Sequence, residues 1–154
     1  MTVELFDTPF EPYTLLQQHQ SSRLKSGSYG ACASFVGSMR DFNEGDRVRS
    51  MELEHYPGMT EKQLAEIVED AKQQWPLDDA LVAHRVGLIQ PGEPIVLTVC
   101  WSTHRAAAFE ACRFLMEALK SRAPFWKKET LGDDDIKGEK SRWVANNTAG
   151  YSEK

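Results

Sequence analysis

A run of seven mostly apolar residues in the middle of the chain sets the main limit on the fold. Residues 95–101 read Ile-Val-Leu-Thr-Val-Cys-Trp, which is apolar on both faces of an extended strand. Such a strand needs cover on both sides, so it is expected in the centre of a sheet with helices packed against it. The turn at residues 90–94 joins it to a second strand at residues 80–86, and so short a connection favours antiparallel pairing.

Helices are predicted on either side of these strands. A weakly amphipathic helix is expected at residues 12–20. The segment at residues 60–63 has the pattern of a capping box with Thr60 as N-cap, and an apolar stripe continues to Trp75 before Pro76 ends the helix. A third helix is expected after Ser102 and Thr103, which offer N-cap oxygens. Its buried stripe is predicted to be Ala108, Phe109, Cys112, Leu115, Met116 and Leu119.

The remaining segments are predicted as short strands and polar loops. Strands are expected at residues 3–6, 31–37, 48–56, 125–130 and 142–145. A long hairpin loop at 38–47, a charged loop at 132–140 and a frayed tail at 146–154 complete the chain. This order predicts an α+β fold, with a mostly antiparallel or mixed sheet and packed helices, in a single domain spanning residues 1–154.

Composition excludes several classes of function. The net charge of -5 argues against a general nucleic-acid binder, and no apolar run is long enough to span a bilayer. The N-terminus lacks a signal sequence, so a cytoplasmic location is expected. The three cysteines form no CxxC pair and are expected to be core thiols rather than disulfides or zinc ligands. No GxGxxG, Walker, HExxH or GxSxG motif occurs, so neither a metal nor a cofactor is predicted.

A dense cluster of cations is the strongest candidate for a site. Residues 120–129 read Lys-Ser-Arg-Ala-Pro-Phe-Trp-Lys-Lys-Glu, at a predicted junction between a helix and a strand. Strand alternation places Phe125, Lys127 and Glu129 on one face and Lys128 on the other, so the two lysines cannot share a pocket. Lysines close to one another lower each other's pKa, and fixed cations suit an anionic substrate.

Other cations stand where they could join this cluster. Arg40 follows a predicted strand, while His104 and Arg105 begin the third helix, where free backbone N–H groups favour an anion. Each also has an ordinary explanation as solvated surface charge, and Lys120 could simply stabilise a helix end. Together they predict a cation-rich pocket that binds a phosphate and offers a lysine as nucleophile or acid/base.

These segments, taken together, resemble the MoaE family, the large catalytic subunits of molybdopterin synthase. The two most specific matches are the 120–129 segment and residues 53–59, which read Leu-Glu-His-Tyr-Pro-Gly-Met. Shorter matches at 37–40, 84–87, 91–93, 102–105 and 142–144 follow in the family's order. The match covers about residues 30–145, while residues 1–29 and 146–154 carry little of the pattern. The resemblance implies the family's α/β-hammerhead type of fold.

The resemblance also implies a reaction, partners and site residues. The family transfers sulfur from a thiocarboxylated, ubiquitin-like small subunit with a Gly-Gly tail to cyclic pyranopterin monophosphate. Its large subunits form a homodimer within a heterotetramer, and pocket residues from both are thought to meet. The residues implied as catalytic are Lys120 and Lys127, and those implied as substrate-binding are Ser38, Met39, Arg40, His104, Arg105, Lys128 and Glu129. Two alternatives are a non-catalytic module that binds a ubiquitin-like partner and another enzyme acting on a phosphate ligand.

Overall fold

The computed structural model describes residues 1–132 and 140–145, which form three helices and nine strands. The helices are α1 (Pro12–Arg23), α2 (Met59–Gln74) and α3 (Arg105–Arg122). The strands are β1 (Thr2–Phe6), β2 (Ala31–Ser38), β3 (Phe42–Asn43), β4 (Asp46–His55), β5 (Leu77–Arg85), β6 (Gly87–Ile89), β7 (Pro94–Ser102), β8 (Phe125–Leu131) and β9 (Lys140–Trp143). The loop and tail predicted beyond Gly132 and Ala145 lie largely outside the described residues.

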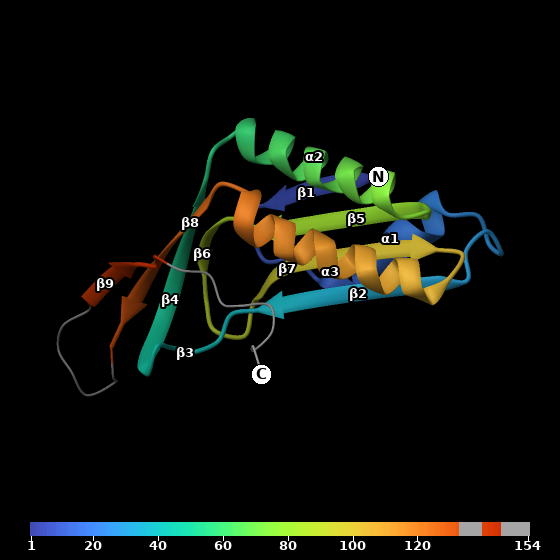
Figure 1. The fold of residues 1–154 in the computed structure, drawn as a ribbon. Coiled ribbons are helices and arrows are strands. Elements are labelled where there is room, and N and C mark those ends of the chain that lie inside the picture. Colours follow the sequence, from blue (N-terminus) through green and yellow to red (C-terminus); the bar gives the residue numbers. More distant parts are fainter. Residues whose placement is uncertain (133–139, 146–154) are drawn as a thin grey trace.

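The first sheet has the strand order β1-β5-β7-β2 (Figure 1). The β7 strand lies between β5 and β2 and pairs antiparallel with both, so the predicted central strand is confirmed. The pairing of β1 with β5 is parallel, which makes the sheet mixed. The side chains of β7 are buried on both faces, from Val96 at 5% exposed to Trp101 at 0%. The predicted α+β class is therefore confirmed.

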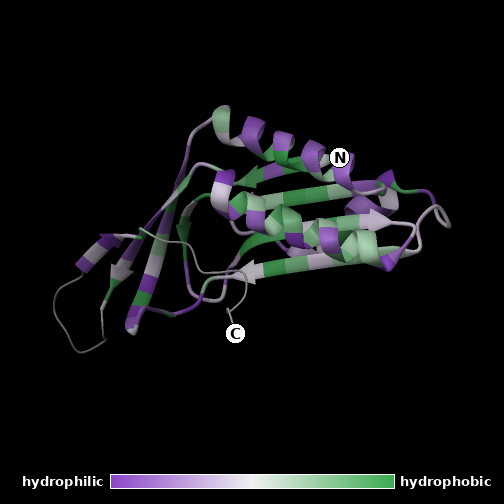
Figure 2. Cartoon of the chain, viewed as in Figure 1, coloured by the Kyte–Doolittle hydropathy of each residue, from purple (hydrophilic) through white to green (hydrophobic). Residues whose placement is uncertain are grey.

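Two hydrophobic clusters cover the two faces of this sheet. On one face Val96 and Cys100 of β7 pack against α2 and α3, with Leu64 and Leu115 among the buried helix residues. On the other face Leu97, Val99 and Trp101 pack against Phe10 and α1. Figures 1 and 2 show α2 and α3 crossing one face of the first sheet, whose central strands are coloured mainly as hydrophobic. Burial on both sides explains why β7 carries apolar residues on both of its faces.

A second sheet extends beyond the end of the first and was not predicted as separate. Its order is β3-β4-β8-β9, and β6 pairs with β4. After β5 the chain turns at Gly87, whose φ of 81° lies in the left-handed region that favours glycine. This turn lets the next strand, β6, leave the first sheet and pair with β4. A register shift between Val48 and Ser50 lets both Val48 and Met51 face inward, where strict alternation would separate them.

The prediction of Thr60 as the N-cap of α2 is wrong. Gly58 occupies that position with a φ of 83°, and the Glu61 carboxylate accepts a hydrogen bond from the Gly58 N–H at 2.6 Å. Thr60 is fully buried instead. Its hydroxyl accepts from the Tyr56 N–H at 2.9 Å and donates to the Pro124 carbonyl at 3.3 Å. Thr60 therefore joins α2 to the junction before β8.

Further local predictions need correction. The N-cap of α3 is His104, which makes no side-chain capping bond, and Ser102 donates to the Pro76 carbonyl at 2.7 Å. Phe109, placed in the buried stripe, is 67% exposed because it lies on the outer side of α3. Cys32 is exposed on the edge strand β2, so only Cys100 and Cys112 are core thiols.

Candidate active site

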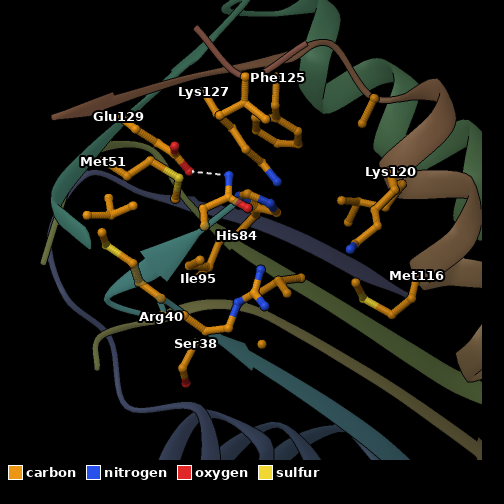
Figure 3. A pocket seen from close by; sticks show the side chains of 18 of the residues that line it. Ser38, Arg40, Met51, His84, Ile95, Met116, Lys120, Phe125, Lys127 and Glu129 are labelled. Carbon is orange, nitrogen blue, oxygen red and sulfur yellow. Dashed lines mark hydrogen bonds between the residues drawn. The ribbon is translucent and has the colours of Figure 1, made fainter. Parts of the chain in front are cut away.

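A cavity of about 300 Å³ lies where the two sheets and the end of α3 meet. Its wall combines the end of β2, the β3–β4 hairpin, β8 and the last turns of α3 (Figure 3). Apolar side chains, including Phe35, Ile95, Met116 and Leu119, make up part of the lining, and charged side chains lie among them. This volume is at the lower end of the range of small-molecule sites in proteins.

Three cations from distant parts of the sequence point into this cavity. Arg40 follows β2, Lys120 lies in the last turn of α3, and Lys127 extends from β8 (Figure 3). Burial lowers the pKa of Lys127, and the positive charges of Lys120 and Arg40 lower it further, while Glu129 acts in the opposite direction. A lysine with a lowered pKa in a cationic pocket is suited to acid/base or nucleophilic work on an anionic substrate.

Glu129 is the only carboxylate among the described residues that line the cavity, and it is 6% exposed. Its Oε1 accepts from Asn43 Nδ2 at 2.8 Å, and its Oε2 accepts from Arg142 Nε at 3.1 Å. Arg142 also donates to Asp46 Oδ2 at 2.8 Å and to the Asn43 carbonyl at 3.0 Å. These bonds fasten the β3–β4 hairpin to β8 and β9, which fixes the wall from which Arg40 reaches the cavity.

His84 lines the cavity as well, although its place in the sequence gave little reason to select it. It lies near the end of β5, is 4% exposed, and stacks on Phe125 with ring centroids 4.0 Å apart. Burial lowers the pKa of His84 to about 4, and the charge of Lys127 contributes in the same direction. The ring is therefore neutral at physiological pH. Asn43, Met116 and Phe35 were likewise not predicted as site residues.

Six of the predicted site residues line this one cavity: Ser38, Met39, Arg40, Lys120, Lys127 and Glu129. Lys128 does not, because strand alternation turns it to the opposite face of the sheet. There its ammonium lies 5.7 Å from the centroid of the Trp143 ring. The structure thus agrees with the prediction that Lys127 and Lys128 point to opposite faces of the strand.

The structure does not bring His104 and Arg105 to the same cavity. Both are at the beginning of α3, whereas Lys120 is near its end. Arg105 and Lys120 are fifteen positions apart in the helix, a distance of about 22 Å along the axis. Within the described part of a single chain, these two residues therefore stand apart from Arg40, Lys120 and Lys127.

The fold and the cavity together define a class: a small α+β protein with a half-apolar, cationic pocket for an anionic organic molecule. Cations fixed by two sheets and a helix end stabilise negative charge without reorganisation. No helix among the described residues is long and apolar enough to cross a membrane.

The chain belongs to the MoaE protein family, whose model matches residues 7–122. It is 46% identical over 144 residues to the molybdopterin synthase catalytic subunit of Pseudomonas aeruginosa, covering 94% of this chain and 90% of that protein. It is 50% identical over 115 residues to the subunit of the same name from Escherichia coli, covering 75% and 73%.

Solved structures of similar proteins share the fold. The MoaE protein of Burkholderia ambifaria is 40% identical, with a TM-score of 0.75 over 93% of this chain and 88% of that one. The molybdopterin synthase of Staphylococcus aureus is 29% identical, with a TM-score of 0.79 over 93% and 96%. The similarity extends over both sheets, since nearly the whole chain is covered in each case.

Proposed function

We propose that this chain is the catalytic subunit of a molybdopterin synthase and acts as a sulfurtransferase. Its substrates would be cyclic pyranopterin monophosphate and the thiocarboxylated C-terminus of a ubiquitin-like small subunit. The observation that carries the proposal is the convergence of Arg40, Lys120 and Lys127 on one cavity. Both substrates are anions, and bringing two anions together requires fixed positive charge.

The three cations of the cavity would have separate roles in this reaction. Arg40 would hold the phosphate or pterin, and Lys120 would lie beside the thiocarboxylate. The thiocarboxylate sulfur attacks a substrate carbon, a carbon–oxygen bond at that carbon breaks, and the departing oxygen takes up a proton. The small subunit is then joined to the substrate through sulfur in an acyl (thioester) intermediate. Water then cleaves the bond between the acyl carbon and sulfur, which leaves the sulfur on the pterin and a carboxylate on the small subunit. Lys127, with its lowered pKa, would supply the second acid/base or electrostatic group.

The positions of His104 and Arg105 support a site completed by a second copy of the chain. In the described structure, β2 is an edge strand of the first sheet, with one side unpaired. Its eight residues and the 18 residues of α3 both span about 27 Å. The start of β2 adjoins the start of α3, since the Gly30 N–H donates to the Ser102 carbonyl. Antiparallel pairing of β2 with β2 of a second copy would therefore carry that copy's His104 and Arg105 toward Lys120.

Exposed apolar side chains support the same arrangement. Phe35 of β2 is 44% exposed and Phe109 of α3 is 67% exposed. Both would be covered if two copies joined along β2. In this proposal two catalytic subunits form a homodimer and one small subunit binds at each cavity, which gives a heterotetramer.

The test is reconstitution of the reaction. Purified protein is mixed with a thiocarboxylated small subunit and cyclic pyranopterin monophosphate, and the product is measured as its fluorescent oxidised pterin. Lys120→Ala is expected to abolish turnover. The matched control is Arg122→Ala, which removes a cation two residues away whose guanidinium pairs with Asp70 outside the cavity, at 2.7 Å.

The outcomes separate the competing interpretations. Product formation that persists in Arg122→Ala and disappears in Lys120→Ala supports the sulfurtransferase. Near-normal turnover in Lys120→Ala removes Lys120 from the mechanism. A stable complex with the small subunit but no product would indicate a binding module.

A further inference from the structure

His84 is a buried titratable group in the cavity wall and has no role in the reaction proposed above. Its Nδ1 lies 2.6 Å from the Arg85 carbonyl oxygen. A carbonyl oxygen can only accept a hydrogen bond, so Nδ1 carries the proton. In the neutral ring, Nε2 is then an unprotonated nitrogen with a lone pair. The stacking on Phe125, with an interplanar angle of 12°, fixes the plane of the ring.

The charges around His84 are mostly positive. Lys127 comes from β8, Lys120 from α3 and Arg40 from the segment after β2, while Glu129 of β8 is the one carboxylate among the described lining residues. Both Glu129 oxygens already accept hydrogen bonds, from Asn43 and Arg142. The hydrogen bond of the His84 ring among the described residues is made at Nδ1, which leaves Nε2 as an acceptor for a further donor.

Lys127 is the donor best placed to use this acceptor. Its side chain points from β8 into the cavity toward the His84 ring (Figure 3), and the charge of Lys127 acts on His84. Phe125, on which the ring stacks, is two residues from Lys127 on the same face of β8. The described structure has no hydrogen bond between the two groups, but rotation about the four-carbon lysine side chain can form it. Catalytic hydrogen bonds are often long before substrate binds.

We propose that His84 is a positioning residue for Lys127, whose ammonium donates a hydrogen bond to His84 Nε2 and is thereby held in the cavity. The ring stays unprotonated because burial lowers the pKa of His84 to about 4, so the lone pair is available at physiological pH. The catalytic consequence rests on the proposed function, but the contact itself does not.

The contact predicts a direction for the pKa of Lys127. A hydrogen bond accepted from the ammonium stabilises the charged form and partly opposes the effect of burial. Removing the acceptor should therefore lower the pKa of Lys127 further. A hydrogen bond to a charged group has the strength to move a pKa by about one unit.

Two variants of similar size separate the two ring nitrogens. His84→Asn keeps a side-chain N–H near the Nδ1 position for the Arg85 carbonyl and removes the acceptor. His84→Gln places an amide oxygen near the Nε2 position. The pKa of Lys127 is measured in the purified protein by NMR of ¹³C-labelled lysine side chains, with Lys127→Arg to assign the signal. We expect a decrease of about one unit in His84→Asn and a smaller decrease in His84→Gln.

A measurement on the unsubstituted ring does not depend on how the His84 variants fold. Nitrogen NMR of the wild-type imidazole should show a protonated Nδ1 and an unprotonated Nε2, and Lys127→Met should shift the Nε2 resonance. The proposal is overturned if the pKa of Lys127 is unchanged in folded His84→Asn. It is also overturned if the Nε2 resonance has the same position in Lys127→Met as in the wild type. Neither experiment needs substrate, so failure here is distinct from failure of the proposed function.

The pH profile of turnover then tests the catalytic consequence. In His84→Asn the limb assigned to Lys127 should move to lower pH, and in His84→Gln it should return toward the wild-type position. Lower turnover with an unmoved profile would mean that His84 only supports the fold of the cavity wall.

Discussion

Replacing Thr60 by valine tests whether a single buried hydroxyl joins α2 to the junction before β8. Valine has nearly the shape of threonine, so no cavity forms, but the hydroxyl is lost. The Tyr56 N–H then loses its acceptor at 2.9 Å, and the Pro124 carbonyl loses its donor at 3.3 Å. Thr60 itself is 0% exposed, so water does not readily replace the hydroxyl.

The size of the effect follows from these two bonds. An unsatisfied buried polar group costs about 1–3 kcal/mol, and the Tyr56 bond is only partly buried, so a loss of about 1–2 kcal/mol is expected. For a chain of this length, each kcal/mol lowers the melting temperature by about 2–4 °C, so the midpoint should fall by about 2–8 °C. Thr60→Ser is the matched control, because it keeps the hydroxyl and removes one methyl group.

Urea unfolding at a fixed protein concentration measures the stability, and amide hydrogen exchange identifies the bond. The Tyr56 amide should lose protection in Thr60→Val and keep it in Thr60→Ser. The reasoning is refuted if Thr60→Val unfolds within about 0.5 kcal/mol of the wild type, the range of an ordinary surface substitution. It is equally refuted if the Tyr56 amide stays protected in that variant.

Two further perturbations probe the cavity and the beginning of α3. The pKa of Lys127 in the folded protein lies below its unfolded value of 10.5, so the charged lysine lowers the stability of the fold at neutral pH. As the pH rises through the folded pKa toward 10.5, the lysine loses its proton and this loss of stability disappears. Lys127→Met should therefore be more stable than wild type at pH 7, with a difference in urea unfolding that shrinks toward pH 10.5; a difference independent of pH would contradict this. A Cβ at Gly30 would lie 2.5 Å from the Thr103 carbonyl oxygen, so Gly30→Ala should cost about 1–3 kcal/mol and shift the backbone amide resonances of residues 103–105. Unchanged stability and resonances would show that this contact relaxes freely.

Much of the first sheet could be predicted because its signals are local. The continuous apolar run of β7 requires cover on both faces, and Pro76 ends α2 for reasons of backbone chemistry alone. Errors arose where a residue's environment depends on contacts distant in sequence. Phe109 has helical spacing but faces outward, and Thr60 has capping chemistry but its hydroxyl bonds to a residue 64 positions away.

The candidate site was predictable to the extent that one segment carries it. Residues 120–129 hold two of the three cations of the cavity, and alternation along β8 correctly separates Lys127 from Lys128. His84 and Asn43 could not be selected in this way. His84 and Asn43 line the cavity only because β5 and the β3–β4 hairpin lie next to β8. The residues that flank them in the sequence do not indicate this contact.

The sequence by itself determined the α+β class, the central strand, the cationic segment and the family, because hydrophobic periodicity and motifs are properties of neighbouring residues. Only the tertiary structure decided that the strands divide into two sheets and that Arg40, Lys120 and Lys127 share one cavity. It also decided that His104 and Arg105 do not line that cavity. The physical reason is that long-range strand pairing and the direction of each packed side chain are set by the whole core at once.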